Sequence, residues 1–189
     1  MKISQQIVGV NQRLGNTAVP NMQGTTRVIF DTVQGTGTSQ TLRYFDGVSS
    51  RRFPLSNLSQ NKFEVGESLA IMGFAFFNYT QANPTLTTEF FGIWQSAASN
   101  NGIFNFYIGN QRVLKDIEVV RMGQITLGET NMQSVLPACI LRLETPIVIP
   151  PQIEFYATLR LDSLSSYDAQ NVVCSAYGQG TLLNTKSSF

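Results

Sequence analysis

The chain has 189 residues and a formal net charge of +1, from 13 Lys and Arg against 12 Asp and Glu. Only 13% of its residues are charged, which argues against bulk electrostatic binding of nucleic acid because such binding needs clustered cations. It has no histidine, which excludes Ser-His-Asp and Cys-His catalysis, histidine-ligated zinc and histidine proton shuttles.

The first 24 residues are polar, and no hydrophobic period persists among them. Glycine and proline interrupt them at Gly9, Gly15, Pro20 and Gly24. We therefore expect an extended N-terminal arm over residues 1–24, ordered only by a neighbour. Removing the arm is expected to leave the domain folded but to impair assembly.

Short apolar segments separated by turn-forming residues follow the arm. In the first half of the chain they predict strands over Thr26–Val33, Gln40–Asp46, Ser68–Tyr79, Leu86–Trp94 and Ile103–Ile108. Ser68–Tyr79 is apolar on both faces, which also fits a buried helix, but the flanking Gly66 and Pro84 favour a strand. Residues 49–60 read as a loop with at most one helical turn.

In the second half, Gly109-Asn110 predicts a hairpin turn, because both residues tolerate a positive φ. Gln111–Met122 fits a strand or an amphipathic helix, and its β-branched residues favour the strand. Further strands are predicted over Gln124–Leu127, Ala138–Glu144 (ended by Pro146), Ile153–Leu161 and Asn171–Tyr177. Of these, Ile153–Leu161 alternates most strictly, with an apolar residue at every second position.

The predicted set comprises about eight to ten strands, with no long helix and no repeat of 20 to 50 residues. All seven prolines fall at predicted strand ends or in loops. The fold class is therefore all-β: a single jelly roll or two-sheet antiparallel β-sandwich over residues 25–189, preceded by the arm. No run of about 18 apolar residues is present and no leader pattern opens the chain, so we expect neither a membrane span nor a secretion signal.

Paired carboxylates are the strongest chemical candidates, because a glycosidase can work with two of them and no histidine. Asp116 and Glu118 stand two apart on a predicted strand, where they share a face and are best explained as solvated. Glu64 and Glu67 flank Gly66 and fit a turn better than a catalytic pair. We predict no catalytic residue, no cofactor-binding residue and no metal ligand.

The remaining motifs are weak. Gly35-Thr36-Gly37 lacks the third glycine and the helix of a dinucleotide loop. Arg51-Arg52 is the only basic doublet and fits a surface pair, an interface salt bridge or a contact with encapsulated nucleic acid. The segment Asp162–Asp168 offers oxygen ligands but no glycine, so we interpret it as an ordinary polar loop.

Two kinds of apolar residue point to a core. Ten aromatic residues fall within 34 positions and are expected to be mainly core, although exposed members could stack on sugars: Phe74, Phe76, Phe77, Tyr79, Phe90, Phe91, Trp94, Phe104, Phe106 and Tyr107. Cys139 and Cys174 are expected to be reduced, buried thiols, with a single disulfide as the alternative.

Two segments carry a family resemblance: Phe53–Phe77 (FPLSNLSQNKFEVGESLAIMGFAFF) and Leu143–Asp162 (LETPIVIPPQIEFYATLRLD). They resemble jelly-roll coat proteins of small tailless icosahedral bacteriophages. In those chains a TNL…N.LP.GE.F.I..I phrase leads into the first long core strand, and an I.IPPQ..F…L phrase into a late one. Here Phe63-Glu64 stands where Leu-Pro is usual.

The resemblance implies a non-enzymatic capsid subunit that assembles with copies of itself and other virion shell proteins, with weak contact to packaged nucleic acid. It also implies a place in the virion, after assembly in the host cytoplasm. The chain is short for a double jelly roll, so a coat subunit, a vertex protein and an accessory shell protein all remain open. The alternatives are a receptor- or carbohydrate-binding spike or fibre module, and a histidine-free glycosidase.

Overall fold

The computed structural model describes residues 22–34, 41–47, 53–79, 102–118, 123–127, 136–160 and 171–183. Within these ranges all regular secondary structure is β-strand, which confirms the all-β prediction. In chain order they are β1 (Met22–Gln34), β2 (Thr41–Tyr44), β3 (Ser68–Tyr79), β4 (Ile103–Ile108), β5 (Gln111–Glu118), β6 (Gly123–Leu127), β7 (Leu136–Ile149), β8 (Phe155–Arg160) and β9 (Asn171–Leu183).

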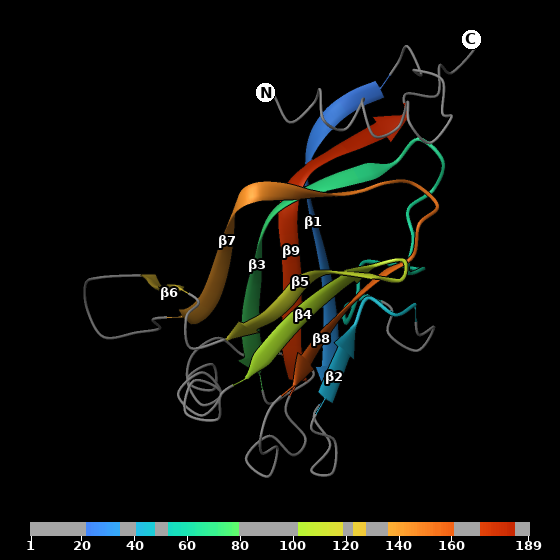
Figure 1. The fold of residues 1–189 in the computed structure, drawn as a ribbon. Helices are drawn as coiled ribbons and strands as arrows, with labels where there is room; N and C mark the ends of the chain where they lie inside the picture. Colours follow the sequence, from blue (N-terminus) through green and yellow to red (C-terminus); the bar gives the residue numbers. More distant parts are fainter. Residues whose placement is uncertain are drawn as a thin grey trace.

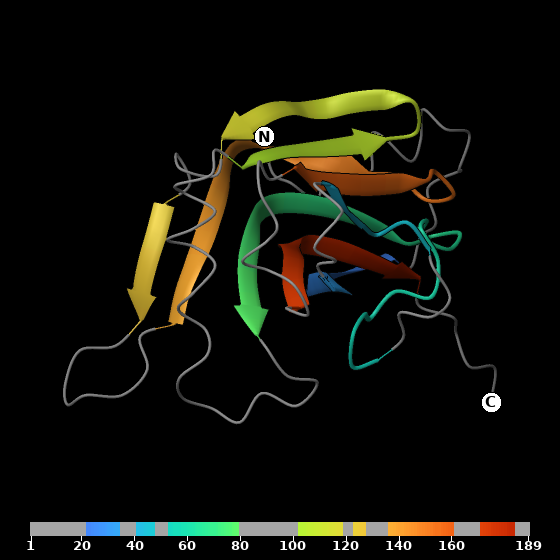
Figure 2. The ribbon, with the colours of Figure 1, turned by 90° about the horizontal axis from the view of Figure 1, so that it is seen from below.

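The strands form two antiparallel sheets that face one another (Figure 1). One sheet has five strands in the order β1-β9-β3-β7-β6, and the other has four in the order β2-β8-β4-β5. Figure 2 shows β4, β5 and β8 in one layer and β3, β9 and β1 in the other. The predicted two-sheet antiparallel β-sandwich is therefore confirmed.

The strand pairs are nested along the chain. β1 pairs with β9, β2 with β8, β3 with β7, and β4 with β5. Successive pairs alternate between the two sheets, as in a long hairpin wrapped into a jelly roll. β6 lies outside this nest, at the edge of the sheet beyond β7 (Figure 1).

Several predicted boundaries agree with the structure and others fall outside it. β3 and β4 begin and end at the predicted residues, and residues 53–60 form turns and bends without a helix. β1 begins at Met22, three residues before the predicted start of the domain at residue 25. Residues 1–21 of the predicted arm and the predicted strand at 86–94 lie outside the described residues.

The prediction that Pro146 ends a strand is wrong, because β7 continues through it to Ile149. The reason lies in the pairing with β3. Ile71 faces Ile147 and Gly73 faces Arg142, so residues 143–146 bulge opposite Met72 without a register partner on β3. Proline has no N–H to give a ladder, and a bulge is where a sheet can accept one.

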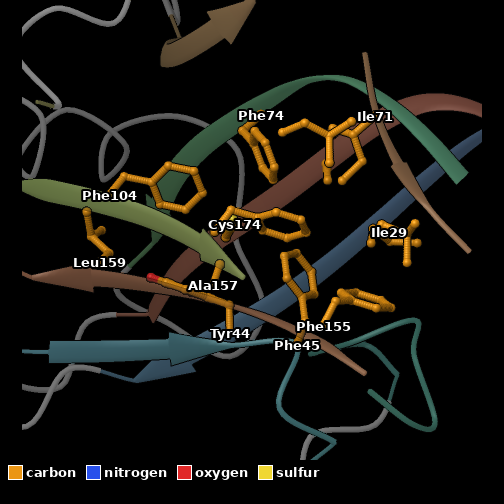
Figure 3. Packing of buried hydrophobic residues seen from close by; sticks show 14 of the residues in the cluster. Ile29, Tyr44, Phe45, Ile71, Phe74, Phe104, Phe155, Ala157, Leu159 and Cys174 are labelled. Atoms are coloured by element: carbon orange, nitrogen blue, oxygen red, sulfur yellow. The ribbon is translucent and has the colours of Figure 1, made fainter. Parts of the chain in front are cut away.

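The core lies between the sheets and is rich in phenylalanine (Figure 3). Phe74 of β3 contacts Phe104 and Phe106 of β4, with ring centroids 5.0 and 5.1 Å apart. Phe76 packs edge-on against Phe104 at 4.9 Å. These four rings are fully buried, so the core interpretation is correct for them; such aromatic pairs add to the free energy gained by burying their area.

Candidate functional site

The two segments that carry the family resemblance meet at one end of the sandwich. The carbonyl oxygen of Phe63 accepts two hydrogen bonds from Gln152, from its backbone N–H at 2.9 Å and from Nε2 at 3.1 Å. The N–H of Phe155 donates to the carbonyl of Asn61 at 2.8 Å. The resembling phrases therefore form one structural unit, which we call the end cluster: residues 61–67 together with 150–155.

An aromatic contact and an ion pair complete the end cluster. The Phe63 ring lies 5.1 Å from that of Phe155, and the guanidinium of Arg27 lies over the Phe63 ring, 4.6 Å from its centroid. Arg27 also pairs with Glu67 at 3.1 Å. Phe63 is thus buried beneath an arginine that is itself held by a carboxylate, and these contacts stabilise this end of the sandwich.

The carboxylates Glu64 and Glu67 occupy a turn, as the sequence predicted. The N–H of Glu67 donates to the Glu64 carbonyl at 3.0 Å, and Gly66 between them has a φ of 84°. Glu64 accepts a bond from the amide of Gln60 at 3.1 Å. Both side chains thus have bonding roles in the turn.

Asp116 and Glu118 lie on β5, whose backbone is distorted at Asp116. Asp116 has a φ of 51°, and its N–H donates to the side-chain oxygen of Asn105 at 2.8 Å. Its carboxylate pairs with Arg112 at 3.3 Å on an exposed surface. Glu118 is half-buried opposite Ile103. The exposed ion pair explains Asp116 without any catalytic role.

A row of cationic and aromatic side chains crosses the outer face of the four-stranded sheet. Tyr107 of β4 and Tyr156 of β8 face each other in register and stack at 4.4 Å, with ring planes 8° apart. Arg43 of β2 lies over Tyr156 at 4.3 Å, and Arg112 of β5 faces Tyr107 in register. A lectin needs an open aromatic face, but Tyr156 is covered by Tyr107 on one side and Arg43 on the other.

Asp31 is a buried residue that the sequence did not single out. It lies on β1 at 2% exposure, and its carboxylate accepts the N–H of Phe45 at 2.7 Å and that of Thr32 at 3.1 Å. Phe45 has a φ of 58°, which bulky residues rarely adopt. The available signal was an acid in phase with Ile29 and Val33, on the same face of the predicted strand.

Cys174 is a free, buried thiol on β9. Burial raises the pKa of this thiol well above its ordinary value, and the negative charge of Asp31 raises it further. Cys139 of β7 and Cys174 both face Phe76 in register, from opposite sides of β3. Their Cα atoms are therefore about 10 Å apart, two strand spacings, which excludes the alternative disulfide within this chain.

Other candidates fall where the structure gives no description: Gly35-Thr36-Gly37, Arg51-Arg52, the Asp162–Asp168 loop, Phe90, Phe91 and Trp94. The side chains of Phe77 and Tyr79 are likewise outside the description. Across the described ranges no three His, Cys, Asp or Glu side chains gather closely enough to hold a metal ion. In the same residues no helix is long and apolar enough to cross a membrane.

The chain matches no protein-family model and no curated protein.

Proposed function

We propose that this chain is a non-enzymatic structural subunit of a virion shell, which assembles with copies of itself and with other shell proteins. One observation carries the proposal. The two phrases that resemble bacteriophage coat proteins bond to each other in the end cluster, inside a sandwich whose strands are nested as a jelly roll. The resemblance is thus matched by a shared structural role for the two phrases.

The composition supports the same proposal. A net charge of +1 gives little long-range repulsion between copies, and the chain has few charges to desolvate at a contact. Symmetry repeats one weak contact many times, so the sum of the contacts stabilises a closed shell although each alone does not. The proposed place of action is the virion, with at most weak contact to packaged nucleic acid.

A receptor- or carbohydrate-binding module is the alternative. The outer row of Arg43, Tyr156, Tyr107 and Arg112 is its best surface, but the Tyr156 ring is already stacked on Tyr107 and contacted by Arg43. This geometry favours the shell over the lectin.

Sedimentation velocity and negative-stain imaging of the purified protein over a range of concentrations test the proposal. We expect concentration-dependent oligomers and closed particles, formed alone or with the other shell proteins of the same virion. A strict monomer at high concentration that also fails to join any particle contradicts the proposal. Binding to a glycan array by such a monomer supports the alternative.

A further inference from the structure

Among the described strands, four lie at the edges of the two sheets, and three of these are poor sites for adding a further strand. β2 has four residues and β6 has five. β5 is interrupted by two register shifts and carries Arg112, Lys115, Asp116 and Glu118. Shortness, bulges and charge are the features that keep edges from pairing with other chains. β1 differs, since its 13 residues pair with β9 in one uninterrupted register.

Part of the outer edge of β1 is covered by Ser56 and Asn57. The amide of Asn57 accepts the N–H of Phe30 at 2.8 Å and donates to the carbonyl of Val28 at 2.8 Å. The backbone N–H of Asn57 and the hydroxyl of Ser56 both donate to the Phe30 carbonyl. This cover occupies the edge at Val28 and Phe30 and does not reach the N-terminal part of the strand.

The uncovered part presents backbone groups at alternate residues. Val28 and Phe30 direct their groups away from β9, so Met22, Gly24 and Thr26 do the same. Among the described residues no backbone group pairs with these three on the outer side; the Thr26 carbonyl accepts a hydroxyl bond from Thr25 at 3.3 Å. None of the residues 22–26 is charged.

We propose that residues 22–26 of β1 pair antiparallel with the same residues of a second copy, about a two-fold axis through Gly24. Gly24 then faces Gly24 of the other copy, and Met22 faces Thr26, with about six backbone hydrogen bonds in all. The two five-stranded sheets become one continuous sheet. The inference rests on the proposed self-assembly and names one of its contacts.

The occupant is a second copy for three reasons. An edge that pairs with itself about a two-fold axis closes as a dimer and leaves no new edge there. The uncharged side chains of residues 22–26 bring no like charges together. Asn57 covers each copy at Val28, which limits the pairing to the uncovered residues and so fixes its register.

Cysteine cross-linking tests the axis directly. In a background with Cys139→Ser and Cys174→Ala, the Gly24→Cys variant places two thiols across the axis, with Cα atoms about 5.5 Å apart, within disulfide range. A Cβ at residue 24 meets no atom of the described residues within 4 Å, so the variant is expected to fold. The control is Thr26→Cys, which faces Met22 of the other copy instead of itself.

We expect mild oxidation to give covalent dimers of the Gly24→Cys variant at least tenfold faster than of the Thr26→Cys variant. Equal rates, or no dimer from either, overturn the inference. A second pair of variants is compared by sedimentation velocity, which measures dimerisation. Thr26→Pro removes an outward N–H and is expected to weaken dimerisation at least tenfold, whereas Thr26→Val is expected to leave it unchanged.

The outcomes separate this inference from the proposed function. Particles that form while Gly24→Cys gives no selective cross-link overturn the edge contact and leave the shell proposal standing. Selective cross-linking without particles supports the edge contact and counts against the shell. The cross-linking pair decides the contact even where Thr26→Pro fails to fold.

Discussion

Asp31 shows how one buried charge organises its surroundings. Its carboxylate holds the backbone N–H groups of Phe45 and Thr32, and it faces Cys174 across the β1–β9 pair. A buried carboxylate stays charged at low cost only where donors surround it. The sequence offered twelve acidic residues, and nothing local marked Asp31 as the anchor of a turn that starts 14 positions later.

Replacing Asp31 with alanine is expected to lower the free energy of unfolding by about 2–3 kcal/mol, because the N–H of Phe45 then lies buried without an acceptor. Asp31→Asn is the matched control, since its amide oxygen can still accept that bond, and it is expected to cost about half as much or less. Urea unfolding of both variants measures the difference. Equal losses would show that the bond to Phe45 is not what matters.

Cys174 is expected to make the free energy of unfolding depend on pH in the alkaline range. The unfolded thiol ionises near its ordinary pKa of 9.0, whereas the folded thiol keeps its proton because its pKa is raised. Above that pH ionisation therefore favours the unfolded chain, and the free energy of unfolding falls by up to about 1.4 kcal/mol per pH unit. Below about pH 8 the thiol is protonated in both states, so it does not change the free energy of unfolding with pH.

The comparison is wild type against Cys174→Ala, with urea unfolding between pH 7 and pH 10.5. The other alkaline groups titrate in both proteins, so the difference in stability isolates the thiol. We expect the wild type to lose stability relative to the variant above pH 9. Parallel curves would mean that the thiol ionises equally well in the folded protein.

At the scale of strands, β9 depends on glycine where it crosses β3. A Cβ at Gly178 would overlap the carbonyl oxygen of Ala70, whereas a Cβ at Gly24 on β1 meets nothing within 4 Å in the part of the chain that the structure describes. Gly178→Ala is thus expected to cost at least about 2 kcal/mol, since the backbone must shift. Gly24→Ala is expected to change stability by no more than about 0.5 kcal/mol. Thermal unfolding of the pair checks both values.

A second comparison sets Phe63 of the end cluster against Phe53, ten residues earlier and outside the cluster. Phe63 is 2% exposed and packs on Phe155, while Phe53 is 83% exposed. Phe63→Ala is expected to cost about 3–5 kcal/mol, and Phe53→Ala close to nothing. Chemical denaturation of the two single variants decides it. A large loss at Phe53 would place that ring in a contact that the structure does not describe.

Strands flanked by turn-forming residues could be predicted from the sequence. The full extent of strands that contain proline or glycine could not. Ser68–Tyr79 and Ile103–Ile108 lie between turn residues, and their bounds agree with β3 and β4. β7 passes through Pro146, because a bulge removes the need for its N–H. β9 passes through Gly178 and Gly180, because the chains approach closely there. Both exceptions depend on a neighbouring strand that the local sequence does not reveal.

At the scale of the whole molecule, alternation predicted two sheets but not the strand order within them. Phe155, Ala157 and Leu159 are buried as the pattern of β8 indicated. The pairing of β1 with β9 joins residues about 150 positions apart, which only the complete set of strands determines. The outer row of arginine and tyrosine was not predicted for the same reason, since it comes from four separate strands.

The nested pairing brings Met22 and Leu183 side by side as partners at one end of the β1–β9 pair. A circular permutant that joins these two residues by a short linker, with new termini opened between Gly109 and Asn110, therefore keeps every strand pair. The permutation reverses the order of the nested strand pairs along the sequence, because β4 and β5 become the outermost strands and β1 and β9 the innermost. We expect it to fold to the same sandwich with an altered folding rate, which circular dichroism and stopped-flow refolding would measure. A permutant that stays unfolded would mean that the covalent β4–β5 connection is needed for a stable fold.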